Sequence, residues 1–193
     1  MWRPPFISKL VPEDRCHLSG LALRDGAAAY VTAYAPTDVA FGYRSRRLDG
    51  GCVIDVVTGK VVIDGLCMPQ SPRVYQDKLW LHNAGTGYFG FVDFDRRVFE
   101  PIAFCPGILE GLAFWGHHAV MGLSLPRSPE QIAGLPFVKN LAEKGAAARC
   151  GVQVVDLRSG EVSHWIRLEG DFREVRGVAV LAGIKKPLVV TVG

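Results

Sequence analysis

The sequence predicts an all-β protein of β-propeller type, with about three and a half blades of a ring that we expect to contain six. An apolar strand ending in Asp and a turn occurs three times, as V-I-D-V-V-T-G-K from Val53, F-V-D-F-D-R-R from Phe91 and V-V-D-L-R-S-G-E from Val154. The three aspartates lie 38 and then 63 residues apart, and the second spacing contains a Pro-, Ala- and Lys-rich insertion of 24 residues at 126–149. Without the insertion both spacings are near forty residues, which is typical of four-stranded propeller blades.

A second phrase marks the strand that should begin each blade and line the inside of the ring. It reads L-S-G-L-A-L from Leu18, L-E-G-L-A-F from Leu109 and V-R-G-V-A-V from Val175, and a variant begins at Ser71. Each copy is followed by a turn and by a strand of high β-propensity. The predicted turns contain Gly26, Gln76-Asp77, Gly116 and Gly183.

These signals divide the chain into blades at about 17–66, 68–104 and 106–169, and the start of a fourth blade that has only two of its four strands. We therefore expect residues 1–193 to form one partial propeller domain. Only a closed ring hides the edge strands that would otherwise promote aggregation. The expected partner is a second copy of the chain or the missing half of the propeller in a longer protein.

The insertion at 126–149 carries the one segment with a helical pattern, at 136–148. Phe137, Leu141 and Lys144 are spaced to share one helical face, and Gly145 weakens the last turn. We expect a helix or loop that covers one face of the propeller as a lid, or that only packs against it.

Composition excludes several classes of function. The formal charge is +3 from 22 basic and 19 acidic residues that are interleaved, so the chain lacks the large positive field of a nucleic-acid-binding protein. The only basic cluster is Arg44, Arg46 and Arg47, which indicates a solvated loop. No apolar run approaches the roughly 20 residues of a membrane span, and the stretch M-W-R-P-P-F-I-S-K-L lacks the apolar region expected of a signal peptide.

The five cysteines form no C-x-x-C pair, and their odd number leaves one thiol over in any disulfide scheme. Reduced thiols are the simpler interpretation, and they predict a cytoplasmic protein.

Several longer motifs resemble a known family. They include W-R-P-P-F-I-S-K-L-V-P-E-D-R-C-H-L-S-G-L-A from Trp2, M-P-Q-S-P-R from Met68, L-W-L-H-N-A-G-T-G from Leu79 and C-G-V-Q-V-V-D-L from Cys150. Over nearly its whole length the chain resembles an uncharacterised bacterial conserved-hypothetical family whose members carry a domain of unknown function, sometimes beside tetratricopeptide repeats. The resemblance implies no activity. It implies that this chain is the C-terminal part of a longer domain.

The chain departs from the usual pattern of that family at three positions near the starts of inner strands. Ser19 stands where Asn is commoner, Gln70 where His is commoner and Gly177 where Asp is commoner. Propeller sites usually lie at such positions, so the resemblance implies that a family site, if there is one, is altered in this chain.

Polar residues near the starts of the inner strands form the candidate ligand site, because equivalent positions in a ring converge on its axis. Arginine can bind a carboxylate or phosphate in a bidentate manner, and histidine can move a proton near neutral pH. The alternative is that arginines and carboxylates only pair with one another between blades. The candidates are Asp14, Arg15, His17, Ser19, Ser71, Arg73, Glu110, Arg127 and Glu174.

The leading hypothesis is a binding module, without a cofactor, that recognises a small anionic ligand or a partner peptide. The alternative is a metal-dependent hydrolase or lactonase of propeller type that acts only in the complete ring. Such enzymes hold a divalent cation with Glu, Asn and Asp oxygens. The chain has only Asn83 and Asn140, whereas Asp14, Glu110 and Glu174 could supply carboxylates.

Two further sets of residues have a structural interpretation. Asp55, Asp93 and Asp156 recur at one place in the repeat, which predicts hydrogen bonds that cap turns. The tryptophans at strand positions are predicted to pack between blades, namely Trp80, Trp115 and Trp165.

Overall fold

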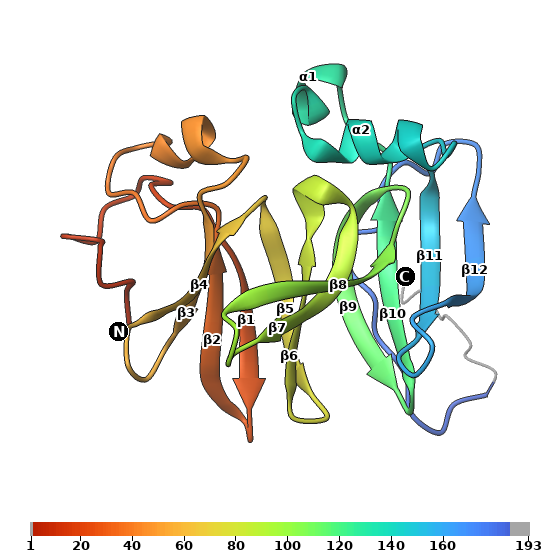
Figure 1. The fold of residues 1–193 in the computed structure, drawn as a ribbon, viewed down its shortest axis with the longest axis horizontal. Helices are drawn as coiled ribbons and strands as arrows, with labels where there is room; N and C mark the ends of the chain where they lie inside the picture. The colour runs from red at the N-terminus through yellow and green to blue at the C-terminus, as the bar shows by residue number, and fades with distance from the viewer. Residues whose placement is uncertain (1, 186–193) are drawn as a thin grey trace, which may run out of the picture.

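The computed structural model describes residues 2–185, which form three four-stranded antiparallel sheets, each with its strands in chain order (Figure 1). The first sheet contains β1 (Leu18–Arg24), β2 (Ala27–Ala33), β3 (Gly51–Asp55) and β4 (Val61–Leu66). The second contains β5 (Pro69–Tyr75), β6 (Lys78–Asn83), β7 (Tyr88–Asp93) and β8 (Val98–Phe104). The third contains β9 (Ile108–Trp115), β10 (His118–Ser124), β11 (Cys150–Asp156) and β12 (Val162–Leu168).

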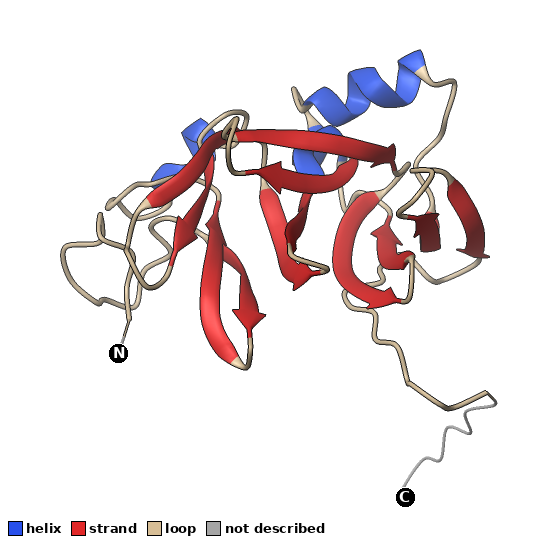
Figure 2. Ribbon diagram, turned by 60° about the horizontal axis from the view of Figure 1, so that its bottom comes forward, coloured by secondary structure: helices blue, strands red, loops and turns tan. Residues whose placement is uncertain are grey.

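Each sheet coincides with one of the units predicted at 17–66, 68–104 and 106–169, so the all-β class and the repeat are confirmed. The sheets lie side by side, with β5 in contact with both β1 and β9 (Figures 1 and 2). The first strand of each sheet therefore packs against the first strand of the next.

The two ends of the strands differ in their connections. Six short turns lie at one end of the strands, which we call the turn end. They join β1 to β2, β3 to β4, β5 to β6, β7 to β8, β9 to β10 and β11 to β12. The connections at the other end carry the helices, and β1, β5 and β9 begin there. We call it the site end. Its helices are the 3-10 helices η1 (Gly42–Arg46) and η2 (Ala84–Thr86) and the α-helices α1 (Pro129–Ile132) and α2 (Pro136–Glu143).

Alternation of apolar side chains along each strand produces two apolar clusters between the sheets. Between the first and second sheets, Ala22 and Tyr30 pack with Leu79 and Leu81. Complete burial of a leucine side chain such as that of Leu79 contributes about 1.5–3 kcal/mol to the free energy of folding. The second cluster joins the second sheet to the third, through Trp80, Phe89, Leu109, Leu112 and Met121.

The repeated aspartates cap hairpin turns, as predicted. Asp55 Oδ1 accepts hydrogen bonds from the Thr58 amide (2.7 Å) and hydroxyl (3.0 Å). Asp93 Oδ1 accepts from two backbone amides of its own turn, and Asp156 Oδ1 accepts from the Arg158 amide (2.9 Å). These carboxylates replace backbone hydrogen bonds that the tight turns leave unmade.

The insertion forms two helices rather than the single helix predicted at 136–148. α2 begins at Pro136 as predicted, because proline is favoured at the first position of a helix. It ends at Glu143 because Gly145 adopts φ +57, which is incompatible with a right-handed helix. Phe137 is fully buried and packs near Cys67 and Ile108, so the insertion is anchored to the site end.

The prediction of a fourth inner strand at Val175 is wrong in part. Residues 173–180 carry no strand, because an isolated segment has no neighbouring strand to pair with in a ladder. The segment nevertheless lies against β9, where a Cβ added at Gly111 would come within 2.7 Å of Gly177. The turn at Gly183 is present, with φ +77, and the returning strand predicted after it lies outside the described residues.

Candidate functional site

The first residues of the inner strands meet at the site end. The Ser19 hydroxyl donates to the Pro69 carbonyl, and the Gln70 amide donates to the Leu109 carbonyl. The Gly111 amide donates to Ser71 Oγ at 3.1 Å. The structure therefore brings Ser19 and Ser71 to the region predicted from the sequence, but each side chain is used to join one sheet to the next.

Asp14 and His17 form a carboxylate–imidazole pair just before β1. Asp14 Oδ2 lies 2.6 Å from His17 Nδ1, and Asp14 Oδ1 accepts the His17 backbone amide at 3.0 Å. The carboxylate therefore holds both the ring and the backbone, and a hydrogen bond from Nδ1 leaves Nε2 as the basic nitrogen. The ring also packs against Tyr34 and Tyr43, with centroids 4.4 and 4.8 Å away.

Four residues of the site end have strained backbone conformations. Eight described residues other than glycine have positive φ, and four of them lie in the turns of the turn end. The other four, with φ between 52° and 56°, are His17, Phe41, Met68 and Ser71, all at the site end. Such conformations cost of order 1–3 kcal/mol each and persist where the surrounding structure imposes them, often at functional sites.

A cavity of about 250 Å³ opens beside the pair. It is lined by Tyr34, Tyr43, Arg44, Arg47 and Met68. Two of these residues, Tyr34 and Tyr43, also contact His17, and Met68 is one of the residues with positive φ.

The two arginines of the cavity carry charge that no carboxylate neutralises. Arg44 lies over the Phe41 ring, 4.3 Å from its centroid. Arg47 donates to the Gln131 carbonyl at 3.2 Å and to the Ala133 carbonyl at 2.7 Å. Within residues 2–185, neither guanidinium forms an ion pair, so both positive charges remain available to an anion.

Arg15, by contrast, is fully engaged. Its guanidinium contacts Glu13 at 2.9 Å and Asp38 at 2.7 Å. Hydrogen bonds from Ser8 and from Arg15 lower the pKa of Asp38 to about 2. Arg15 thus fixes the segment before β1 by pairing within the first sheet's unit, not between sheets, and with Asp14 and His17 it lines a separate cavity of about 280 Å³.

Glu110, Arg127 and Glu174 form a second charged group, on the third sheet and the segment after it. Arg127 Nε lies 2.5 Å from Glu174 Oε1, and Arg176 Nη2 lies 2.8 Å from Glu174 Oε2. Glu110 Oε2 is buried, has no hydrogen-bond partner among the described residues, and burial raises the pKa of its carboxyl. Burial raises the pKa of Tyr34, and the charge of Glu110 raises it further.

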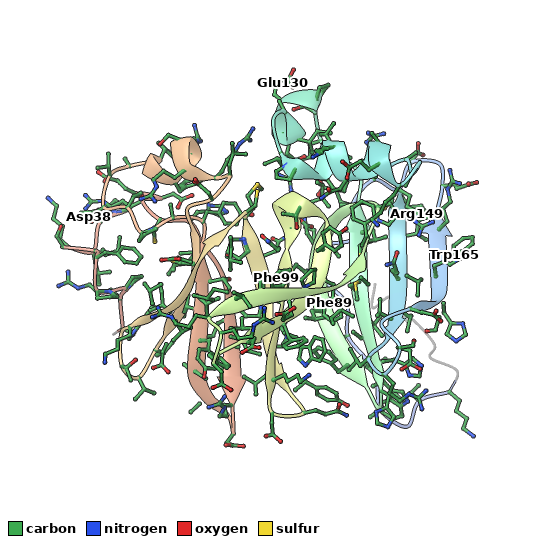
Figure 3. The ribbon with its side chains drawn as sticks, in the orientation of Figure 1. Asp38, Phe89, Phe99, Glu130, Arg149 and Trp165 are labelled. Carbon is green, nitrogen blue, oxygen red and sulfur yellow. The ribbon has the colours of Figure 1, made fainter. Side chains whose placement is uncertain are left out.

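Arg73 lies apart from the other predicted site residues. It is exposed on β5, where Nη1 donates to the Pro72 carbonyl at 2.8 Å. Figure 3 labels Asp38, the partner of Arg15, on the part of the molecule that holds the N-terminal segment.

Sequence reasoning missed all five residues that line the cavity. A signal for them existed in the run F-G-Y-R-S-R-R from Phe41, where the only basic cluster lies beside two aromatic residues. The interpretation as a solvated loop holds for the exposed Arg44 and Arg46 but not for Arg47, which bonds the insertion.

Other chemical features are limited. Among residues 2–185, no three His, Cys, Asp or Glu side chains are grouped so that they could hold a metal ion. All five cysteines are buried thiols without a disulfide. No helix of the described part is long and apolar enough to cross a membrane.

Comparisons with known proteins identify a family and a fold. The sequence matches the family described as Domain of unknown function (DUF4915) over residues 1–190. No curated protein matches it at a significant level. Among solved structures, it is similar to the computationally designed Ika4 protein, with a TM-score of 0.51 and 13% identity over 89% of this chain and 84% of that one.

Two further structures are more distant. The computationally designed Ika8 protein gives a TM-score of 0.47 with 15% identity, and the match covers 85% of this chain but 40% of Ika8. Kuenenia stuttgartiensis hydrazine synthase gives 0.34 with 14% identity, covering 88% of this chain and 52% of that one. The likeness to Ika4 concerns the fold alone.

Proposed function

The chain belongs to the DUF4915 family of domains of unknown function, and we propose from its geometry that it is a binding module for a small anionic ligand. The observation that carries this proposal is the cavity lined by two tyrosines and by two arginines without a carboxylate partner. In this proposal the three sheets are consecutive blades of a propeller-type arrangement. The cavity lies at the site end, where the first strand of each sheet begins.

The size and lining of the cavity restrict the ligand. A volume of about 250 Å³ is below the roughly 300–1,000 Å³ of sites for drug-sized molecules. Guanidinium groups recognise carboxylates and phosphates through paired, charge-assisted hydrogen bonds. The rings of Tyr34 and Tyr43 and the thioether of Met68 favour a ligand whose remaining part is flat and apolar. A small aryl or unsaturated carboxylate or phosphate fits these requirements better than a long peptide.

Titration with phenyl phosphate tests the proposal, with phenol as the neutral analogue of the same shape. We expect phenyl phosphate to bind more tightly than phenol in isothermal titration calorimetry. Arg44→Ala combined with Arg47→Ala should weaken the binding of phenyl phosphate at least about tenfold, since charge-assisted hydrogen bonds contribute about 1.5–3 kcal/mol each.

The matched control is Arg96→Ala, which removes an exposed arginine from the turn between β7 and β8. It should leave the affinity unchanged. Equal binding of phenol and phenyl phosphate, or an affinity insensitive to the double substitution, would show that the cavity is not an anion site.

The Asp14–His17 pair favours a second candidate function, a hydrolase that uses His17 as its general base. An imidazole whose Nδ1 is held by a carboxylate can accept a proton from water at Nε2 while the water attacks an ester carbonyl. A metal-dependent lactonase is the variant of this function that the sequence suggested, in which carboxylates such as Asp14, Glu110 and Glu174 would hold the cation.

Hydrolysis of dihydrocoumarin, an aryl lactone, separates the two candidates. The hydrolase predicts turnover that His17→Asn abolishes, and its metal-dependent variant predicts stimulation by added Ca²⁺ or Zn²⁺. The binding-module hypothesis predicts no turnover of dihydrocoumarin, with or without added Ca²⁺ or Zn²⁺. It also predicts that the same protein binds phenyl phosphate.

A further inference from the structure

Two hollows adjoin where the N-terminal segment meets the first sheet. One is the cavity of about 280 Å³ beside Arg15, which residues 2–18 form. The other has a volume of about 450 Å³ and lies over β1 and β2. Trp2 and Leu18 line both, so the two spaces share a wall. We call the first the polar hollow and the second the apolar hollow.

The apolar hollow lies on the side of the first sheet that faces away from the second sheet, at one end of the row of sheets (Figure 1). Ala22 and Tyr30 pack towards the second sheet. Their neighbours Leu21 and Val31, which pair across β1 and β2, therefore point the other way. Every residue that lines the hollow is apolar or glycine. Leu18 and Leu21 are 49% and 47% exposed, so this apolar surface is open to solvent.

Both carboxylates that line the polar hollow already have basic partners. Glu13 Oε2 lies 2.9 Å from Arg15 Nε, and Asp14 Oδ2 lies 2.6 Å from His17 Nδ1. These two pairs account for the acidic side chains of the lining.

Arg3 and Lys9 give the polar hollow a positive charge that no carboxylate neutralises. Both line it, and neither forms an ion pair within residues 2–185. Arg3 Nη1 donates to the Ser8 carbonyl, which carries no net charge. Both side chains are exposed, so their attraction for an anion is screened by salt but extends over several ångströms.

The indole of Trp2 holds the boundary between the two hollows. Trp2 Nε1 donates to the carbonyl of Val56, a residue of the apolar hollow, at 3.1 Å. The ring is therefore tied to the first sheet while it lines both spaces. The result is a continuous surface that is basic at one end and apolar at the other.

We propose that the two hollows together bind a free fatty acid, with its carboxylate near Arg3 and Lys9 and its acyl chain over Leu21 and Val31. The charge of the head group complements the unneutralised basic side chains. An acyl chain has no polar groups to satisfy, whereas a peptide in the apolar hollow would bury backbone N–H and C=O groups without partners. Together the two volumes fall within the roughly 300–1,000 Å³ of small-molecule sites.

This site is separate from the cavity proposed above for a small anion, because no residue lines both. The two cavities also select different ligands. The cavity at Arg44 and Arg47 takes a small flat anion, whereas the adjoining hollows take a long apolar chain with an anionic head.

Isothermal titration calorimetry with dodecanoate tests the proposal, with each ligand kept below the concentration at which it forms micelles. Butanoate keeps the carboxylate and lacks the long chain, and dodecyltrimethylammonium keeps the chain and reverses the charge. We expect dodecanoate to bind more tightly than either. Decanoate should bind about tenfold more tightly than octanoate, since burial of each methylene raises affinity up to about fourfold.

Two variants locate the chain and the head group. Leu21→Glu places a negative charge in the apolar hollow and should weaken dodecanoate binding at least about tenfold. Lys9→Glu reverses one charge of the polar hollow and should weaken it about fivefold, with a smaller effect at high salt. The matched controls are Val138→Glu on α2 and Lys60→Glu in the turn between β3 and β4, both at exposed positions, and they should leave the affinity unchanged.

A second copy of the chain is the competing occupant of the apolar hollow. It predicts an unliganded chain of twice the monomer mass in light scattering, which Leu21→Glu converts to a monomer, and no binding of dodecanoate. That result would overturn the proposal. So would equal binding of dodecyltrimethylammonium, or an affinity for dodecanoate that neither Leu21→Glu nor Lys9→Glu changes.

The combined Arg44→Ala and Arg47→Ala variant separates this site from the anion cavity. It should retain the affinity for dodecanoate, and loss of that affinity would place the fatty acid in the other cavity and overturn the proposal. Circular dichroism of each variant, with the milder Leu21→Gln as a second substitution that should also weaken dodecanoate binding, excludes loss of folding as the cause.

Discussion

The turn end and the site end differ in which residues their side-chain hydrogen bonds join. At the turn end, the repeated aspartates accept hydrogen bonds within their own hairpins. Other side chains there bond between sheets, as Tyr75 does to the Gly116 carbonyl (2.8 Å) and Arg97 does to the Val62 carbonyl (3.3 Å). At the site end, side chains bond across sheets, as Ser19 does to Pro69 and Arg47 does to Ala133. The comparison indicates that the turn end maintains the repeat, whereas the site end combines residues from distant parts of the chain into a cavity.

The largest expected effect at the site end comes from Phe137→Ala. Phe137 is fully buried and anchors the insertion over Cys67 and Ile108. Removing a buried phenyl group costs about 3–5 kcal/mol. Urea unfolding should show a loss of this size, with the midpoint lowered. A loss under about 1 kcal/mol would mean that the insertion is not anchored there.

As the pH falls, backbone amides at the site end should lose protection from hydrogen exchange before those at the turn end. Hydrogen bonds from Ser8 and Arg15 lower the pKa of Asp38 to about 2, and those from Arg158 lower the pKa of Asp156 further. Both folded pKa values lie below the ordinary value of about 3.9, so each carboxylate stabilises the fold above that pH and ceases to do so as the pH falls through its folded pKa.

Hydrogen exchange between pH 4 and pH 2 measures this difference. We expect the amides near Ser8 and Asp38 to lose protection at higher pH than those near Arg158. Asp38→Asn should remove the pH dependence at the site end only. Simultaneous loss of protection at both ends would contradict the comparison.

Removing the capping carboxylate of one turn should lower the free energy of unfolding less than Phe137→Ala does. Asp55→Ala and Asp93→Ala each delete the acceptor of two hydrogen bonds within one turn, and each should lower the free energy of unfolding by about 1 kcal/mol. Because the two carboxylates share no hydrogen-bond partner, the double variant should lose about the sum of the two. Urea unfolding of the three variants checks both statements, and strong non-additivity would show that the turns are coupled.

The smallest effect is expected from relieving strain at the turn end. Asp77 has φ +59 in the turn between β5 and β6, where glycine has no steric penalty. Asp77→Gly should therefore raise stability by about 0.5–1 kcal/mol in urea unfolding. Met68→Gly relieves similar strain at the site end but removes a wall of the cavity, so it should weaken binding of phenyl phosphate. An unchanged affinity in Met68→Gly would remove Met68 from the site.

The turn end was more predictable from the sequence than the site end. The aspartate turns and the division into three sheets depend on local patterns that repeat near every forty residues, such as those at Asp55 and Asp93. The end of α2 also had a local signal in Gly145, whereas no signal was recognised for α1, the other helix of the insertion.

The cavity depends on contacts between residues distant in the sequence, which no local pattern encodes. Tyr34 directly follows β2 and Met68 directly precedes β5, and the partner of Arg47 lies in the insertion. The tryptophans show the same limit. Trp80 packs between two sheets as predicted, but Trp115 and Trp165 are 55% and 59% exposed. Trp165 lies opposite Gln153 on the face toward the second sheet, but on the edge strand β12 (Figure 3).

The most direct test of an anion site at the site end is to map phenyl phosphate onto the protein by its effects on backbone amide chemical shifts. We predict saturable shifts that gather around Tyr34, Tyr43, Arg44, Arg47 and Met68, with the turns at Asp55, Asp93 and Asp156 unaffected. Shifts spread evenly over exposed arginines at both ends, or an unchanged spectrum at millimolar phenyl phosphate, would contradict the claim that this cavity binds an anion.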